Sequence, residues 1–193
     1  MSRKRTAGSY GDQLTGGTHD VNPQTLSGSI TLSAANTVTE VTLGTPIVRV
    51  GPQTGGNAII MELLKVWCDF PEIDQDNAAA TARRMRFSGS TASSGVTPAM
   101  TGLSNPINLF YMESQVRNAF TAAGTGLLEN DRSPHEFDFT DGAGHGVLVA
   151  TDNLFIQATT TGQANASIFQ FKILYRFKKV SLVEYIGIVQ SQQ

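Results

Sequence analysis

The clearest pattern in the chain is an alternation of apolar and polar residues over positions 167–179, SIFQFKILYRFKK. Every second position carries an apolar side chain, and the positions between carry mainly amide or cationic side chains. Successive side chains of a β-strand point to opposite faces of its sheet, whereas a helix would scatter these apolar positions around its circumference. The pattern predicts a long strand with a cationic face and an apolar face, the latter made of Phe169, Phe171, Ile173, Tyr175 and Phe177.

Shorter runs elsewhere in the chain show the same chemistry. Residues 29–33, 37–43 and 136–140 alternate, and a β-branched run follows Pro46. Residues 147–151 and 154–161 are joined by Asp152–Asn153 so closely that they predict a β-hairpin. The stretch after Lys179 is again apolar and β-prone before a polar end. Glycine, asparagine and proline separate the runs, as expected for strands joined by turns.

Two segments are ambiguous between helix and strand. In residues 58–70, Glu62, Lys65 and Asp69 recur at helix-like spacing, but nearly all even positions and several odd ones are apolar. This second feature is typical of a strand covered on both faces, which we favour. In residues 78–87 the run of alanines suits a helix, whereas Arg84 and Arg86 would share one face of a strand. The sequence leaves that choice open.

Two further segments complete the outline. Residues 88–106 are small and polar, and a loop of this length is usually a binding or surface loop. Ser114 can cap a short helix that Gly124 would end. Counting all runs, the chain predicts an all-β fold, a single jelly roll in the form of an eight-stranded antiparallel β-sandwich with long loops. We expect one domain over residues 28–193, preceded by a flexible, weakly basic arm over residues 1–27.

Composition narrows the functional classes. The chain has 193 residues, a formal net charge of −2 and one cysteine. No apolar run approaches the roughly 18 residues that span a bilayer, and the charged N-terminus lacks an apolar segment after it, so we expect neither a membrane span nor a secretory signal. Cys68 lies in an apolar run and is predicted to be a buried structural thiol.

No catalytic or metal-binding motif stands out. The stretch from His135 to His145 also holds Glu136, Asp138 and Asp141, but its spacing matches no zinc or EF-hand pattern. The glycines form no phosphate-binding loop, and no nucleophile stands beside a base. The sequence therefore predicts a protein that is not an enzyme and has no catalytic residue, metal site or cofactor. A cupin-like enzyme would need clustered metal ligands.

The cationic residues are grouped more strongly than the small net charge suggests. Ten of the 14 Lys and Arg residues fall in three clusters: Arg3, Lys4 and Arg5; Arg83, Arg84 and Arg86; and Lys172, Arg176, Lys178 and Lys179. This grouping predicts a molecule with a basic side that contacts nucleic-acid phosphates without reading base sequence. The alternative is that these side chains pair with acidic neighbours, such as Glu72, Asp74 and Asp76, within a subunit or between subunits.

Two stretches resemble a known family. Residues 61–70, MELLKVWCDF, and 171–193, FKILYRFKKVSLVEYIGIVQSQQ, are similar to the capsid proteins of small circular single-stranded DNA viruses that encode a replication initiator, in particular environmental relatives of the circoviruses. The resemblance implies a jelly roll that assembles with itself into a small icosahedral shell of 60 copies. The shell would enclose a single-stranded DNA genome and recognise a host surface receptor. It implies a protein of the virion, assembled in the host nucleus or cytoplasm.

The N-terminus departs from that family's pattern. Members of the group usually carry a long Arg-rich arm, whereas here the cluster is only Arg3, Lys4 and Arg5. The body clusters would then matter more for genome contact. The alternative function is a monomeric or trimeric jelly-roll module that binds a ligand or receptor, as lectins do, without forming a shell. Trp67, the one tryptophan, lies in mid-strand, which argues against a sugar-stacking platform.

Overall fold

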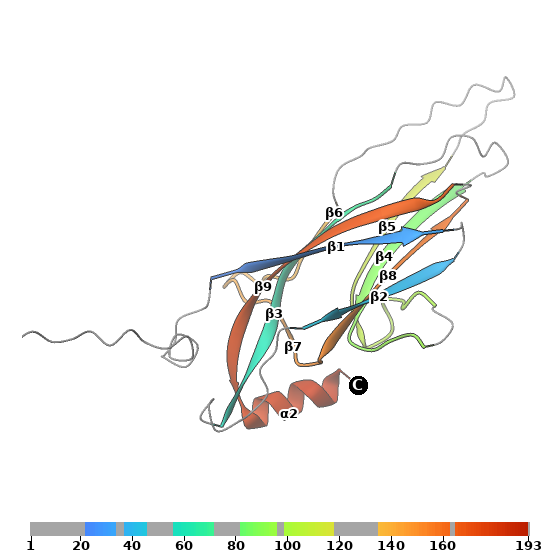
Figure 1. Ribbon diagram of the computed structural model, residues 1–193. Helices are drawn as coiled ribbons and strands as arrows, with labels where there is room; N and C mark the ends of the chain where they lie inside the picture. The colour runs from blue at the N-terminus through green and yellow to red at the C-terminus, as the bar shows by residue number, and fades with distance from the viewer. Residues whose placement is uncertain are drawn as a thin grey trace, which may run out of the picture.

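The computed structural model describes residues 22–33, 37–45, 56–71, 82–95, 99–117, 135–162 and 165–192. Within these ranges the chain forms nine strands and one helix (Figure 1). The bounds are β1 Gln24–Leu32, β2 Val38–Gly44, β3 Asn57–Asp69, β4 Ala82–Ser90, β5 Asn108–Arg117, β6 His135–Asp138, β7 Val147–Val149, β8 Asn153–Thr161, β9 Ser167–Ser181 and α2 Leu182–Ser191.

The strands form two antiparallel sheets. Sheet A has the order β1-β9-β3-β6, with β7 also paired to β3, and sheet B has the order β2-β8-β4-β5. Because β6 and β7 pair with different stretches of β3, they act as one interrupted strand. Each sheet then has four strands, and the chain crosses repeatedly between the two sheets. The predicted all-β fold, a single eight-stranded jelly roll, is confirmed.

Aromatic side chains fill the space between the sheets. The long strand β9 lies at the centre of sheet A, and its odd-numbered residues from Phe169 to Tyr175 are buried. The ring of Phe87 in sheet B lies 5.6 Å from that of Phe171 and 5.7 Å from that of Phe110. β1 passes over Phe171 at Gly28, where an added Cβ atom would lie 2.5 Å from the phenyl ring. The alternation seen in the sequence therefore places the core correctly.

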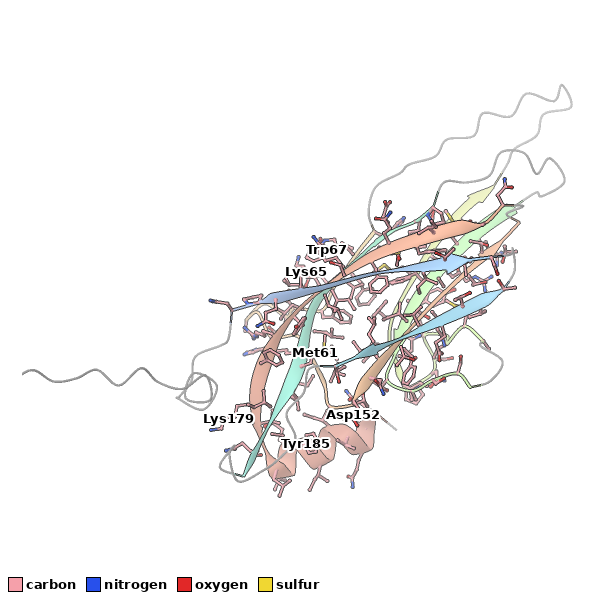
Figure 2. All side chains as sticks on the ribbon, in the orientation of Figure 1. Met61, Lys65, Trp67, Asp152, Lys179 and Tyr185 are labelled. Carbon is pink, nitrogen blue, oxygen red and sulfur yellow. The ribbon has the colours of Figure 1, made fainter. Side chains whose placement is uncertain are left out.

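A second, smaller apolar cluster lies between sheet A and the helix. Ala58 and Ile60 of β3 and Val180 of β9 are buried on the outer face of sheet A, under side chains of α2 that include Tyr185 and Ile188. The helix runs along the end of the sheet, with Tyr185 beside it (Figures 1 and 2). This cover explains the apolar residues on the outer face at the start of β3, and the strand interpretation of residues 58–70 is confirmed.

Helix α2 corrects one prediction. The residues after Lys179 were expected to continue as strand, but β9 ends at Ser181 and a helix follows. The hydroxyl of Ser181 accepts a hydrogen bond from the backbone N–H of Glu184, which caps the helix. Tyr185, Ile188 and Val189 then follow at the helical i, i+3, i+4 spacing and pack on sheet A.

Two more predictions of local structure were wrong. The segment from Ser114 to residue 117 belongs to β5, because its backbone pairs with β4 from Ala82 to Met85. The rest of the predicted helix lies outside the described residues. The predicted hairpin is also absent, since β7 pairs with β3 in sheet A while β8 pairs with β2 and β4 in sheet B. A short link can join strands of two different sheets as well as the two strands of a hairpin.

The remaining expectations divide between those the structure describes and those it does not. The open choice for residues 78–87 resolves to strand β4 from Ala82 on, with Met85 and Phe87 buried. Cys68 is buried as predicted, and burial raises the pKa of its thiol. β1 begins at Gln24, so residues 24–27 of the expected arm belong to sheet A. Residues 1–21 of the arm, the run after Pro46 and the acidic residues at 72–76 lie outside the described residues.

Candidate nucleic-acid interface

The predicted cationic residues lie in different parts of the fold. Arg84 and Arg86 lie on the outer face of sheet B, on the parity opposite to the buried Met85 and Phe87. On sheet A, the even-numbered cations of β9 lie on the outer face, and the structure brings together there Lys172, Arg176 and Lys178. Lys179, of the other parity, is exposed near the end of β9 (Figure 2). Arg3, Lys4, Arg5 and the side chain of Arg83 lie outside the described residues.

The two body clusters therefore occupy opposite outer faces of the sandwich. One flat face of the molecule cannot present both of them, so the single basic side expected from the sequence is not formed by these clusters. Strand register explains the difference: β4 belongs to sheet B and β9 to sheet A, and each strand points its cations away from the shared core.

On sheet A, two cations of β9 pair with a buried carboxylate. Glu62 of β3 is fully buried, and its Oε2 accepts a hydrogen bond from Nε of Arg176, whose side chain is 13% exposed. Lys178 Nζ lies 3.9 Å from the other oxygen, Oε1, which also accepts the backbone N–H of Gly146 at 2.9 Å. The alternative of charge pairing within the subunit thus holds for Arg176 and Lys178, with a partner that the sequence had not suggested.

These contacts keep Glu62 ionised. Burial raises the pKa of its carboxyl group, but the hydrogen bonds from Arg176 and Gly146 and the positive charges of Arg176 and Lys178 outweigh burial. The net result is a pKa below the ordinary value of 4.5. The ion pair joins the two central strands of sheet A to the segment before β7, because Arg176 also donates to the carbonyl of Gly144.

On sheet B, Arg86 faces a carboxylate at longer range. Its Nε lies 3.7 Å from Oε2 of Glu113 on the neighbouring strand β5. The same carboxylate oxygen accepts the hydroxyl of Tyr111 at 2.8 Å, and burial together with this contact raises the pKa of Tyr111 to about 12. Arg86 is thus partly neutralised within the subunit.

A polar network holds part of the long 88–106 segment against sheet B. The side chain of Gln157 is fully buried, and its Oε1 accepts the backbone N–H of Thr101 at 2.9 Å. Its Nε2 donates to Glu40, which also accepts hydrogen bonds from Ser93 and Ser94. Burial raises the pKa of Glu40, and these hydrogen bonds lower it by more. Residues near Ser93 and Thr101 are therefore fixed to the outer face of sheet B.

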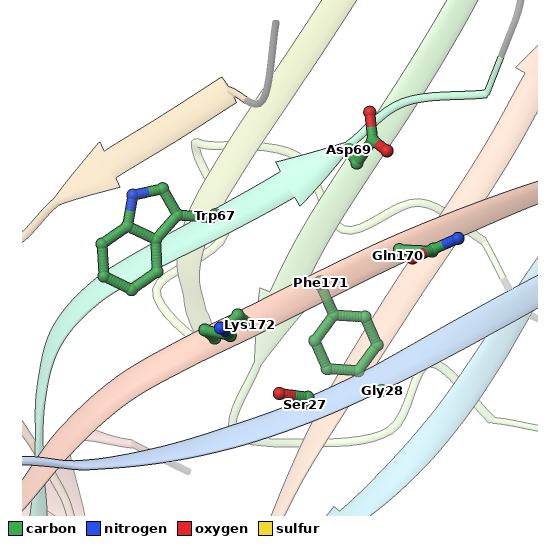
Figure 3. A pocket seen from close by; sticks show the side chains of 7 residues that line it. All are labelled: Ser27, Gly28, Trp67, Asp69, Gln170, Phe171 and Lys172. Atoms are coloured by element: carbon green, nitrogen blue, oxygen red, sulfur yellow. The ribbon is translucent and has the colours of Figure 1, made fainter.

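An open groove crosses the outer face of sheet A beside Lys172. It has a volume of about 510 Å³ and is lined by residues of β1, β3 and β9 (Figure 3): Ser27, Gly28, Trp67, Asp69, Gln170, Phe171 and Lys172. The strand register places Ser27, Lys172 and Trp67 in one row across the sheet. We call this the Trp67 groove. It combines an accessible aromatic ring with a cation.

The acidic strand β6 anchors the tryptophan. Trp67 Nε1 donates to Oε2 of Glu136 at 2.7 Å, and Lys65 Nζ contacts Glu136 at 2.7 Å and Asp138 at 2.8 Å. The hydrogen bond from Lys65 is the largest cause that lowers the pKa of Asp138 to about 2. Lys65 and Trp67 both lie on the outer side of sheet A (Figure 2). The sequence analysis did not propose Trp67 for the site, although its parity with Lys65 and Asp69 was the available signal.

The described residues show no catalytic constellation. His145 Nδ1 lies 3.2 Å from Asp141, whose other oxygen accepts backbone N–H groups of the same turn, and His135 packs edge-on against Phe70. Among the described residues, no group of three or more His, Cys, Asp and Glu side chains could hold a metal ion. Over the same ranges, no helix is long and apolar enough to cross a membrane.

Comparisons with known proteins support the fold assignment. No family model and no curated protein matches the chain. Among solved structures, the capsid protein VP1 of Trichodysplasia spinulosa-associated polyomavirus in complex with 3'-sialyllactose is similar, with a TM-score of 0.54 and 12% identity over 84% of this chain and 97% of that one. The same VP1 with sialylated precision glycooligomers gives a TM-score of 0.52 and 11% identity. At such identity the likeness shows the jelly-roll fold.

Proposed function

We propose that this protein is the coat subunit of a small virus and assembles with itself into an icosahedral shell around a single-stranded DNA genome. The observation that supports this most is the jelly-roll fold, which is similar to that of a polyomavirus VP1 over most of both chains. The resemblance of residues 61–70 and 171–193 to capsid proteins of circular single-stranded DNA viruses supports the genome type. The protein would then reside in the virion, after assembly in the host nucleus or cytoplasm.

Helix α2 offers a surface for assembly. Its inner side packs on sheet A, but Leu182, Val183 and Ile186 on its other side are 46%, 81% and 46% exposed. Exposed apolar side chains grouped in this way are typical of surfaces that another protein covers. In the proposed shell, a neighbouring copy covers them.

For genome contact we propose the outer face of sheet A. Lys172 and Lys178 lie there on one strand, with Arg176 between them held by the buried Glu62, and Lys179 is exposed at the end of the strand. The ammonium groups of Lys172 and Lys178 would contact phosphates without reading base sequence. Arg84 and Arg86 lie on the opposite outer face, so they would not reach the same stretch of DNA.

The assembly proposal is tested by a charge placed on α2. We expect Val183→Asp to prevent particle formation, because a carboxylate in a covered apolar contact must lose its hydration. The matched control is Ser191→Asp, which adds the same charge at an exposed position of the same helix, away from the face that Leu182, Val183 and Ile186 share. Light scattering of the full chain measures assembly, and circular dichroism checks that both variants fold. Normal particles from Val183→Asp would remove α2 from the contact.

The alternative function is a jelly-roll module that binds a ligand or receptor and forms no shell. It is favoured by the presence of glycans in the similar VP1 structures and by an open groove on sheet A. A chain that stays monomeric or trimeric and binds sialyllactose would support this alternative instead.

A further inference from the structure

The Trp67 groove has the form of a stacking platform. Trp67 is half-buried, and the hydrogen bond from its Nε1 to Glu136 fixes the edge of the indole to the neighbouring strand. In Figure 3 the indole is seen broad face on, on the open side of sheet A, next to Lys172. A rigid aromatic face that lies flat on a sheet can stack on a planar ligand at little entropic cost.

The charged side chains near the indole of Trp67 already have oppositely charged partners, except those that line the groove. Glu136 and Asp138 both contact Lys65, and Glu62 is buried under Arg176. Within the described residues, Lys172 has no carboxylate oxygen within 4.0 Å of its ammonium group and is exposed. The groove therefore places an available cation directly beside an aromatic face.

Polar groups at the other side of the groove complete the site. Asp69 lies opposite Gln170 in the register, and Ser27 lies opposite Lys172. A carboxylate, an amide and a hydroxyl can form hydrogen bonds with the amino and carbonyl groups at the edge of a base. The negative charge of Asp69 repels a phosphate, so the phosphate would lie at Lys172. A nucleotide has this combination of a planar apolar face, a polar edge and one negative charge.

We propose that the Trp67 groove binds an unpaired nucleotide of single-stranded DNA, with the base stacked on Trp67 and its phosphate at Lys172. The inference rests on the proposed enclosure of a genome and assigns base stacking to a residue outside the cationic clusters. Proteins that hold single strands without sequence preference combine a cationic path with aromatic side chains in this way. Lys178 lies further along the same face of β9, and Arg176 between the two lysines is held by the buried Glu62.

A nucleotide fits better than a neutral sugar, because a phosphate gives Lys172 a charge partner and a neutral sugar does not. The carboxylate of a sialylated sugar could also pair with Lys172, so the feature that distinguishes a nucleotide is its base, whose flat face can cover the indole of Trp67. A sugar remains the competing outcome in the experiment.

Binding can be read from the protein itself, because Trp67 is the only tryptophan in the chain. We would titrate the full chain with an unlabelled 20-nucleotide oligo-dT and, separately, with 3'-sialyllactose, and follow Trp67 emission. The proposal predicts quenching by the oligonucleotide and none by the sugar. Affinity for a dye-labelled oligo-dT would be measured in parallel by fluorescence anisotropy at several salt concentrations.

Variants separate stacking from charge. Trp67→Leu should weaken oligonucleotide binding by about 5- to 100-fold without changing the salt dependence, because one stacked base is lost. Lys172→Gln should lower the slope of log affinity against log salt by about 1. The matched control is Phe155→Leu, a half-buried aromatic residue on the outer face of sheet B, which should keep affinity within about twofold of wild type. If Trp67→Leu fails to fold, Trp67→Phe should give a smaller loss.

Each other result overturns the proposal in a distinct way. If Trp67→Leu binds DNA as wild type does, the stacking site is wrong while the genome proposal survives. If sialyllactose quenches Trp67 and DNA does not, the groove is a sugar site. If the wild-type chain forms particles but binds no DNA, both the groove proposal and the genome contact fail, and the shell proposal stands.

Discussion

The ion pair between Glu62 and Arg176 allows a quantitative test of the structure. In Glu62→Gln the side chain keeps its size, and its amide oxygen can still accept the N–H of Gly146, but the negative charge is lost. Arg176, at 13% side-chain exposure, is then a nearly buried cation close to Lys178. Removal of one partner of a buried ion pair lowers the free energy of unfolding by about 3–5 kcal/mol. We expect a loss at the lower end, ~3 kcal/mol, because Arg176 keeps its hydrogen bond to the carbonyl of Gly144.

The assay is equilibrium urea unfolding, followed by Trp67 emission and circular dichroism at one protein concentration. The matched control is Glu113→Gln, which removes the same charge from a side chain that is 31% exposed and lies 3.7 Å from Arg86. Because exposed pairs contribute little, the control should lose under ~1 kcal/mol. Equal losses in the two variants would refute the reasoning from burial.

The same pair predicts a pH dependence. The folded-state pKa of Glu62 is lowered from 4.5, so its contribution to stability is present above the unfolded value and is lost as pH falls through the folded value. The difference in unfolding free energy between wild type and Glu62→Gln should therefore shrink below about pH 4.5. A difference that stays constant as the pH is lowered well below 4 would contradict the assigned pKa direction.

Three further substitutions test other contacts with the same unfolding assay. Gly146→Ala places a Cβ atom 1.9 Å from the carbonyl oxygen of Leu63 and should cost about 1–3 kcal/mol through forced backbone movement; a neutral result would mean that the segment before β7 lies elsewhere. Ser181→Ala removes the cap of α2 and should cost ~1 kcal/mol, with no loss if the helix does not begin there. Gln157→Leu leaves the N–H of Thr101 without its acceptor and removes one of the hydrogen bonds to Glu40, and it should cost about 1–3 kcal/mol; unchanged protease resistance of the chain around Ser93 and Thr101 would argue against the network.

The sequence predicted the parts of the fold that depend on local alternation. Phe169, Phe171 and Ile173 are fully or almost fully buried in β9. In β3, the core covers one face, and α2 covers Ala58 and Ile60 on the other. The hairpin and the helix at Ser114 were wrong because strand pairing is decided by contacts far apart in sequence. The residues around Asp152 do not determine whether β8 pairs with β7 or crosses to the other sheet.

The candidate site was less predictable for the same reason. The alternation indicated that Lys172 and Arg176 share a face, but it could not show that Arg84 lies on the opposite outer face of the sandwich. Glu62 was part of an apolar run and gave no sign that it would neutralise Arg176. The Trp67 groove exists because three strands that are distant in sequence, β1, β3 and β9, lie side by side.

The central claim is self-assembly, and one measurement tests it directly. The purified full chain would be run on a size-exclusion column, and each peak would be viewed by negative-stain microscopy with its 260/280 nm absorbance ratio recorded. We expect uniform spherical particles, with a raised ratio that falls after the particles are disassembled and treated with nuclease. A monomer or small oligomer at every salt concentration and pH would contradict it.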